Sequence, residues 1–278
     1  MAQIGQYNTL TVLKVRDFGV FLDGGEHGDI LLPKRYVPDG CKPDDALEVF
    51  VYLDSEDYLI ATTDAPFAVV GTFAALRVKD LNRVGAFLDW GLSKDLLLPF
   101  SEQKKPLKKG DLVVVYIYLD TETDRIAASA KLDKFIDKGP TPFTKGDAVK
   151  LLITDHTDIG YAALINNQYQ GVVYDNDAFR QLSYGEHIEG FIKNIRPDGK
   201  VNLVLQQPGF GKVEGIAADI LQRLREEDGY MAVNDKSSPK LIASLFGTSK
   251  KSFKMAIGTL YKARLITIEE AGIRLNDE

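Results

Sequence analysis

Hydrophobic and polar residues alternate along most of the first 205 residues, in short runs that are separated by turn residues. A period of two places successive side chains on opposite faces, which is the pattern of a half-buried β-strand. In the first 65 residues this pattern predicts five strands, at residues 7–15, 20–23, 29–33, 46–54 and 58–62. The polar triplet at residues 55–57 predicts a hairpin turn between the last two of them.

The same pattern returns at a constant offset of 66 residues. FGVFLD at residues 18–23 recurs as VGAFLD at 84–89, DILLP at 29–33 as DLLLP at 95–99, and VYLD at 51–54 as IYLD at 117–120. Three motifs in one register indicate an internal duplication. The second copy is expected to form strands at residues 70–78, 86–89, 95–99, 111–120 and 125–129.

A third and weaker copy follows the first two. Ile159, Gly160 and Tyr161 stand for the Phe-Gly-Val of the first copy, and its strands are expected at residues 149–154, 161–165, 170–174, 187–195 and 201–205. Five short strands in about 65 residues suffice for a small Greek-key barrel. The chain is therefore expected to contain three tandem barrels.

The pattern becomes helical after the glycine-rich segment at residues 206–211, which we interpret as a linker. A first helix has its apolar stripe at Ile216, Ile220, Leu221 and Leu224 and ends near residues 228–229. The second helix begins with Ser238 as N-cap and Pro239 in its first turn, and stops at Gly247. Its expected buried residues are Leu241, Ile242 and Leu245.

A third helix is capped by Thr248 or Ser249 and extends to Arg264. Two strands follow, at residues 265–268 and 273–275, which completes the element order of a winged helix. On the third helix, one face is apolar (Phe253, Ile257, Leu260) and the opposite one carries Lys251, Lys254, Gly258 and Lys262.

The predicted fold is mainly β with a C-terminal α+β module, in four domains. Their boundaries are expected at residues 1–65, 66–133, 144–207 and 212–278, the last being the winged helix. A hydrophobic content of 45% is sufficient for compact cores. The N-terminus has no basic segment followed by an apolar one, and the chain has a single cysteine, so we expect a soluble cytoplasmic protein without disulfides.

The distribution of charge says more about partners than the net charge of −6. Residues 1–65 carry 5 Lys and Arg against 12 Asp and Glu, whereas residues 66–133 carry 10 against 9. Residues 236–268 contain seven basic residues and no acidic one. A positive surface, which phosphate binding requires, is therefore expected in the C-terminal module.

The barrel motifs carry a family resemblance. The order Phe-Gly-x-Phe, Asp-x-Leu-Leu, then Gly-Asp before a long strand, with Gly110-Asp111 and Gly146-Asp147 in the later copies, resembles the OB-type module of ribosomal protein S1. Together with the helix sequence SKKSFKMAIGTLYK at residues 249–262, the whole chain resembles the conserved virulence factor B family. This resemblance implies an RNA-binding bacterial regulator that acts after transcription, with single-stranded RNA as its partner.

The candidate RNA-binding residues are aromatic rings in the barrels and basic residues in loops and on the third helix. Aromatic faces stack on any base, and lysines bind phosphates. The candidates are Phe18, Phe21, Lys34, Arg35, Phe87, Lys104, Lys105, Tyr161, Tyr174, Lys250, Lys251, Lys254 and Lys262.

Each of these candidates has a purely structural alternative. Phe18 is equally compatible with base stacking and with a barrel core, and Gly19 beside it suggests a close backbone approach. A core position is favoured for Phe21 and Phe87 unless the family resemblance holds, in which case both rings are expected to stack on bases. The basic loop containing Lys104 and Lys105 is favoured as simply solvated, whereas phosphate binding is favoured for the helix lysines.

Catalysis finds little support in the sequence. His27, His156 and His187 lie in or beside turns without a second ligand at metal-binding spacing, and no Walker-type glycine loop or nucleophile elbow is present. We therefore expect a binding protein with no cofactor, metal or membrane partner. The alternative function is a DNA-binding transcription regulator whose barrels mediate dimerisation or protein contacts, and the oligomeric state stays open.

Overall fold

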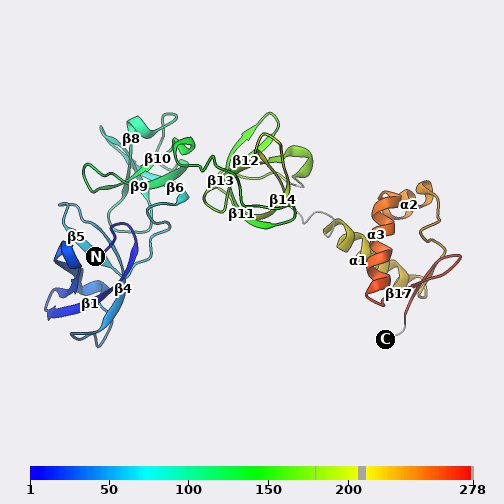
Figure 1. Ribbon diagram of the computed structural model, residues 1–278, viewed down its shortest axis with the longest axis horizontal. Coiled ribbons are helices and arrows are strands. Elements are labelled where there is room, and N and C mark those ends of the chain that lie inside the picture. The colour runs from blue at the N-terminus through cyan, green and yellow to red at the C-terminus, as the bar shows by residue number, and fades with distance from the viewer. Residues whose placement is uncertain (179, 206–210, 277–278) are drawn as a thin grey trace. The chain divides into compact units, whose positions relative to one another are not determined.

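The computed structural model describes residues 1–178, 180–205 and 211–276 of the chain. Within these residues the fold class is the predicted one: three closed five-stranded barrels are followed by a smaller module of helices and a short sheet (Figure 1). Of the expected linker at residues 206–211, only Gly211 belongs to the described residues, as the start of a helix.

The first barrel closes in the strand order β1-β2-β3-β5-β4. Its strands are β1 (Tyr7–Arg16), β2 (Gly19–Asp23), β3 (Asp29–Pro33), β4 (Ala46–Leu53) and β5 (Leu59–Thr62). Short 3₁₀ turns connect some of them: η1 (Gly25–His27) precedes β3 and η2 (Lys34–Tyr36) follows it. The predicted strands agree with these bounds to within one residue at each end.

The second and third barrels repeat this cyclic order, so the duplication extends from sequence to topology. The second contains β6 (Phe73–Leu81), β7 (Gly85–Asp89), β8 (Leu96–Pro99), β9 (Leu112–Leu119) and β10 (Ile126–Ser129), with η3 (Phe100–Glu102) after β8 and η4 (Leu132–Lys134) after β10. The third contains β11 (Ala148–Thr157), β12 (Gly160–Ile165), β13 (Tyr169–Tyr174), β14 (His187–Ile195) and β15 (Val201–Val204), with η5 (Asp175–Asp177) after β13.

The largest error in the strand predictions concerns β6, which begins at Phe73 rather than at residue 70. Val69 and Val70 have the hydrophobicity of a strand, but they belong to the segment between the barrels. The backbone N–H of Val70 donates to the carbonyl of Gly5 in the first barrel (3.0 Å). Gly71 then adopts a positive φ of 88°, which ends the extended segment before the strand begins.

The barrels pack on one another through apolar side chains. Phe50 and Tyr52 of β4 belong to the same buried cluster as Trp90 and Leu88 of the second barrel. The rings of Phe50 and Trp90 meet edge to face, with their centroids 5.7 Å apart. The core is therefore continuous across the first two barrels.

On its other side the second barrel contacts part of the third. Phe73 and Val114 share a buried cluster with Leu152 and Leu164. The backbone N–H of Phe73 donates to Oδ1 of Asn167 (2.7 Å), which satisfies a polar group at the edge of this cluster.

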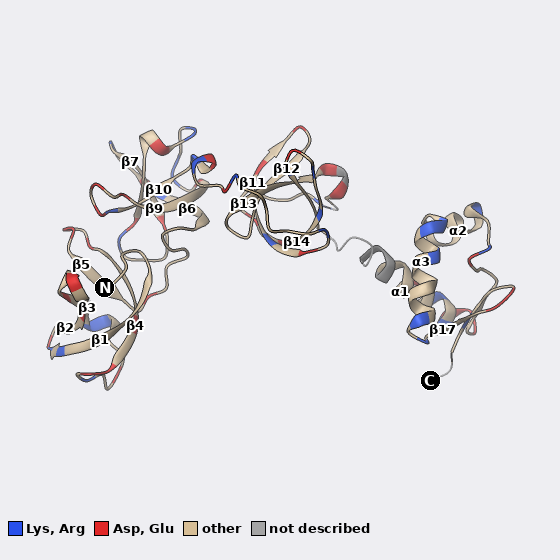
Figure 2. Ribbon diagram, in the orientation of Figure 1, with Lys and Arg blue, Asp and Glu red and all other residues tan. Residues whose placement is uncertain are grey.

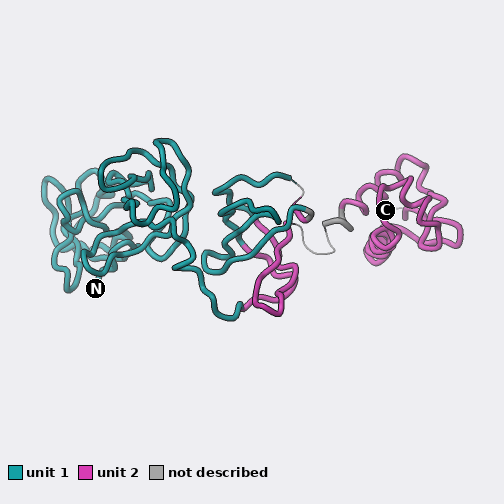
Figure 3. Tube along the Cα trace, turned by 90° about the horizontal axis from the view of Figure 1, so that it is seen from above, with its two compact units in different colours: residues 1–141, 150–175, 180–188 teal, residues 142–149, 176–179, 189–278 magenta. Residues whose placement is uncertain are grey.

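The chain forms two compact units (Figure 3). The first contains residues 1–141, 150–175 and 180–188, and the second contains residues 142–149, 176–179 and 189–278. The boundary between them runs through the third barrel, and the four predicted domain boundaries stay predictions. In the parts of the chain that the structure describes, no helix has the length and apolarity needed to span a membrane.

The C-terminal module has the predicted helix-helix-helix-hairpin order. It consists of α1 (Gly211–Glu226), β16 (Tyr230–Met231), α2 (Pro239–Phe246), α3 (Lys250–Lys262), β17 (Ile266–Ile268) and β18 (Ile273–Leu275). Sequence reasoning missed β16, which pairs with β18 and extends the hairpin to three strands. Ser238 and Ser249 cap α2 and α3 as expected, because their hydroxyls accept from the N–H groups of Leu241 and Ser252.

Two details of these helices differ from the prediction. Leu241 is 40% exposed rather than buried, since it lies one residue, or about 100°, from the inward-facing Ile242. The third helix ends at Lys262 instead of Arg264, because Arg264 adopts a positive φ of 59° that is incompatible with a right-handed helix.

Candidate nucleic-acid interface

The two candidate rings of the first barrel lie on its outer surface. Val20 and Leu22 of β2 are buried, so the intervening Phe21 faces outward and is only half-buried. Phe18, in the turn before β2, is 58% exposed, and its ring meets Phe21 edge to face with centroids 5.9 Å apart. The ammonium of Lys14 lies 4.7 Å from the Phe21 ring centroid. The favoured core position of Phe21 is therefore wrong.

Gly19 does make a close backbone approach, but to its own barrel. A Cβ on this residue would lie 2.3 Å from the carbonyl oxygen of Leu32 in β3. Gly85 and Gly160 stand in the same relation to Leu98 and Val173 of their barrels. The glycine is thus required for strand packing, and its presence does not by itself indicate ligand binding.

The basic candidates of the first barrel follow β3 in η2. Lys34 and Arg35 are both exposed, and the backbone N–H of Lys34 donates to the carbonyl of Phe18 (2.9 Å). The guanidinium of Arg35 lies 4.6 Å from the ring centroid of its neighbour Tyr36. The fold therefore brings Phe18, Phe21 and Lys34 to one end of the barrel.

The second barrel presents a different pair of rings at the equivalent end. Val84 replaces Phe18, and Phe87 faces outward and half-buried like Phe21, so a core position for Phe87 is wrong as well. Phe100 occupies the position of Lys34, is 53% exposed, and donates its backbone N–H to the carbonyl of Val84 (3.3 Å). Sequence reasoning missed Phe100, although the offset of 66 residues from Lys34 could have identified it.

Lys104 and Lys105 lie in the exposed loop between η3 and β9. The ammonium of Lys104 is 3.7 Å from the carboxylate of Asp133. This distance and the exposure of both groups make the pair weak. Both lysines remain accessible to an anion.

The third barrel lacks an accessible ring at its Tyr161 position. Tyr161 is 6% exposed and stacks on the ring of His156 at a centroid distance of 4.3 Å. His156 Nε2 in turn lies 3.0 Å from Oδ1 of Asp175. A base could reach the Tyr161 face only by displacing His156, so we leave Tyr161 out of the interface. Tyr174, at the end of β13, is half-buried.

Helix α3 has a buried apolar side and an exposed side that carries lysines. Figure 2 marks basic residues of this helix in blue. Phe253, Ala256, Ile257 and Leu260 are buried, whereas Lys251, Lys254 and Lys262 are exposed and Lys250 is half-buried. Met255 and Tyr261 are exposed on the same face and were not predicted. We use "lysine face" for Lys251, Lys254, Met255, Gly258, Tyr261 and Lys262.

One lysine of this set has a carboxylate partner. Lys254 Nζ lies 3.3 Å from Oδ2 of Asp235, which stands one residue before the acid-free segment. Among the described residues, Lys250, Lys251 and Lys262 form no ion pair within 4.0 Å. A Cβ at Gly258 would meet no atom within 4 Å, so the middle of the face is open. Among the described residues, the lysine face therefore keeps two positive charges without an ion pair, and Lys250 at the start of α3 adds a third.

The wing hairpin after α3 is held by a buried asparagine that sequence reasoning missed. The Asn234 side-chain amide donates to the carbonyls of Glu269 and Glu270 (3.2 and 2.9 Å), and its Oδ1 accepts from the N–H of Lys236 (2.9 Å). The Glu269 carboxylate accepts from Nε of Arg274 (2.7 Å). Asn234 fixes the hairpin tip against the loop before α2, but two glutamates remain at that tip.

Metal chemistry has no visible site in the described parts of the chain. No group of three or more His, Cys, Asp or Glu side chains there could hold a metal ion. The candidate residues described above are aromatic rings, lysines and one arginine, which are side chains suited to base stacking and phosphate binding.

Comparisons with known proteins identify two types of domain in this chain. The S1 domain family model matches residues 4–64 and 70–131, and the CvfB-like winged helix domain matches residues 218–275. YitL of Bacillus subtilis strain 168, described as an uncharacterized protein, is 29% identical over 93% of this chain and 89% of its own length.

Relatives from staphylococci align over similar lengths. Conserved virulence factor B of Staphylococcus saprophyticus is 28% identical over 82% of this chain and 79% of its own length. Conserved virulence factor B of Staphylococcus aureus strain USA300 is 26% identical over 98% and 94%. The chain therefore carries nucleic-acid-binding domains of the S1 and winged-helix types and is similar over most of its length to the conserved virulence factor B proteins.

Proposed function

We propose that this protein binds single-stranded RNA and regulates its targets after transcription in the bacterial cytoplasm. The rings of Phe18, Phe87 and Phe100 and the lysine face of α3 supply the contacts. The observation that carries the proposal is the position of these rings, which lie outward on two duplicated barrels instead of filling their cores. A single strand exposes base faces to such rings, whereas a duplex keeps its bases stacked inside.

The distribution of charge assigns different contributions to the first barrel and to the C-terminal module. The first barrel has 5 basic against 12 acidic residues, so it repels phosphates and binds weakly alone. The lysine face supplies the attraction that this barrel lacks. Because the modules belong to one chain, weak sites combine through their effective concentration.

The wing argues for single strands over a DNA operator. A winged helix that binds duplex DNA places its third helix in the major groove, and the wing then meets the phosphate backbone. Here the wing tip carries Glu269 and Glu270, whose carboxylates would face phosphates. The regulatory part of the proposal rests on the family resemblance.

The test is competition among single-stranded RNA, single-stranded DNA and duplex DNA at two salt concentrations. We expect single-stranded RNA to bind most tightly. The double substitution Lys251→Ala with Lys254→Ala is expected to weaken binding and to reduce the slope of log K against log salt by about 0.7 per lost phosphate contact. The matched control, Lys145→Ala with Lys150→Ala, removes two exposed lysines from the third barrel and should leave the slope closer to that of the unaltered protein. Preference for duplex DNA with a stable dimer would instead favour a transcription regulator.

A second substitution tests whether a strand approaches the backbone of α3 closely, independently of the lysine charges. Gly258→Ala should stabilise α3 by about 1 kcal/mol, because alanine has the higher helix propensity and its Cβ meets no atom. If a strand packs against the lysine face, the same methyl group should weaken binding. Gly215→Ala on α1, where a Cβ also meets open space, is the control that should stabilise without weakening binding. Unchanged affinity in both variants would remove Gly258 from the interface.

A further inference from the structure

A cavity of about 420 Å³ lies between the first and second barrels. This volume is within the usual range for small-molecule sites. One wall is the outer surface of the second barrel, and the opposite wall is the tip of the β4–β5 hairpin of the first barrel, with Ser55 and Asp57. All residues of the cavity belong to the first compact unit.

The barrel wall contains a row of side chains from four strands. Phe87 on β7 pairs with Leu97 on β8, Leu97 with Ala127 on β10, and Ala127 with Tyr118 on β9. Neighbouring positions in a sheet project to the same side, so these four side chains form one apolar surface with a ring at each end. Such a surface fits the face of a nucleobase.

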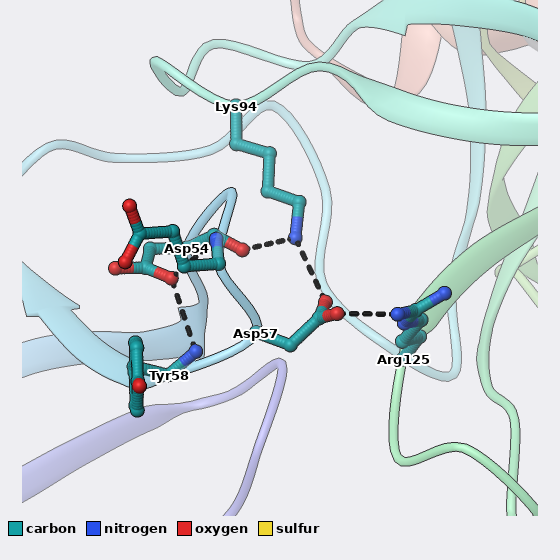
Figure 4. A network of polar contacts seen from close by, with 6 residues as sticks. Asp54, Asp57, Tyr58, Lys94 and Arg125 are labelled. Atoms are coloured by element: carbon teal, nitrogen blue, oxygen red, sulfur yellow. Dashed lines mark hydrogen bonds and ion pairs between the residues drawn. The ribbon is translucent and has the colours of Figure 1, made fainter.

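The hairpin wall contains a carboxylate that is held by two cations (Figure 4). Asp57 accepts a hydrogen bond from the guanidinium of Arg125, and its Oδ1 lies 3.7 Å from Nζ of Lys94. These cations lower the pKa of Asp57, the Arg125 hydrogen bond most strongly. Both cations come from the second barrel, and they therefore define an anion position that the first barrel fills.

The turn of the β4–β5 hairpin fixes the position of the Asp57 carboxylate. Asp54 Oδ1 accepts from the N–H groups of Glu56 and Tyr58 (2.9 and 3.0 Å), which fixes the turn. Asp57 itself adopts a positive φ of 64°. The Lys94 ammonium also donates to the carbonyl of Asp54, so the same cation holds both the backbone and the side chain of the turn.

We propose that this cavity binds one nucleotide of a single strand, with its base on the Phe87–Tyr118 row and its phosphate in place of the Asp57 carboxylate at Arg125 and Lys94. This inference rests on the proposed function and extends it to a defined subsite. A phosphodiester has the same charge as the carboxylate and offers more acceptor oxygens to the arginine fork. Entry of the strand thereby exchanges an ion pair between the barrels for one with the ligand.

The test uses the full chain and a fluorescein-labelled decamer of uridylate. Phe87→Ala should weaken binding about tenfold through the lost stacking surface. Arg125→Gln should weaken it by a similar factor because the phosphate loses its charged donor. Asp57→Asn should tighten binding by about two- to fivefold, because the exposed ion pair between Asp57 and the two cations no longer competes with the phosphate. Asp124→Asn removes a neighbouring charge that does not line the cavity, and should tighten binding less than about twofold.

A crosslinking experiment on the unaltered protein tests the same subsite without depending on whether a variant folds. With 4-thiouridine in the decamer, irradiation should produce an adduct in the peptides that contain Phe87 or Tyr118. Adducts confined to other peptides would overturn the subsite, as would equal effects of Asp57→Asn and Asp124→Asn together with an unchanged Phe87→Ala.

The two proposals fail in different ways. If the unaltered protein binds neither the decamer nor other single strands, the proposed function is wrong and the subsite falls with it. If Lys251→Ala with Lys254→Ala weakens binding but the Phe87 and Arg125 variants do not, the subsite alone is wrong.

Discussion

Barrels 1 and 2 have the same strand order and the same glycine at the start of their second strand, yet their outer surfaces differ. The first carries Phe18 and Lys34 where the second carries Val84 and Phe100. The first has 5 basic against 12 acidic residues, and the second has 10 against 9. The inward residues and the glycine are constrained by packing, whereas the outward positions were free to change. Three predictions probe this difference.

The largest expected effect tests what the barrels share. Gly19→Ala and Gly85→Ala should each lower the free energy of unfolding by about 3 kcal/mol or more, because each Cβ would lie 2.3 Å from a carbonyl oxygen of the neighbouring strand. Urea denaturation followed by circular dichroism measures both. Gly28→Ala is the control: its φ of 72° is strained for alanine but its surroundings are open, so the cost should be about 1 kcal/mol. A loss of stability close to that of the control at only one of the two glycines would show that the glycine does not have the same packing role in both barrels.

An intermediate effect tests how the barrels differ. Phe100→Ala should reduce affinity for single-stranded RNA by about 1–3 kcal/mol, the range for one stacked base. Phe18→Ala should cost less, since the acidic first barrel holds the strand less firmly. Fluorescence anisotropy with a labelled oligonucleotide compares the two. Val84→Ala removes exposed apolar surface without a ring and should have little effect; a larger loss for Phe18 than for Phe100 would reverse the assignment.

The smallest effect is the pH dependence of stability that Glu102 of the second barrel contributes. Burial acts to raise the pKa of Glu102, but hydrogen bonds from the Ser129 hydroxyl and the Lys134 ammonium (2.9 Å) outweigh it and lower that pKa below the ordinary value of 4.5. A lowered pKa in the folded state stabilises the protein above the pKa of the unfolded chain, and this stabilisation is lost as the pH falls through the folded value. The first barrel has Tyr36 at the equivalent position.

Unfolding by urea at pH 7 and at pH values below 4.5 measures this contribution of Glu102. Glu102→Gln should lower stability at pH 7 and flatten the acid-side dependence. A Tyr36→Phe variant, in the matching turn of the first barrel, should leave that dependence as it is. An equal slope in the unaltered protein and in Glu102→Gln would exclude Glu102 as its source.

Most strands could be predicted because the repeat supplied three copies of each signal. The orientation of Phe21 was also available from the sequence, since Val20 and Leu22 alternate with it, but the general preference of large rings for cores pointed the other way. The two residues of β16 are too few to form a period. Tyr161 was a ring in the right region, but its burial depends on His156 and Asp175 from other elements.

The contacts between barrels were beyond the reach of a single sequence. Asp57 looks like an ordinary turn residue, and nothing in its neighbourhood indicates that Arg125, 68 residues later, will bind it. Local patterns report the face on which a residue lies. They do not report which distant surface covers that face, because such pairing depends on how complete domains pack.

Phe50 and Tyr52 illustrate a cost of that packing. Both come from the first barrel, and both are buried in a cluster that the second barrel completes. Cutting the chain near residue 65 would expose these rings to water, and the isolated first barrel would then be prone to aggregation. The first and second barrels should accordingly unfold in a single transition in calorimetry. For the same reason, neither barrel could easily have been transferred alone into another protein by recombination.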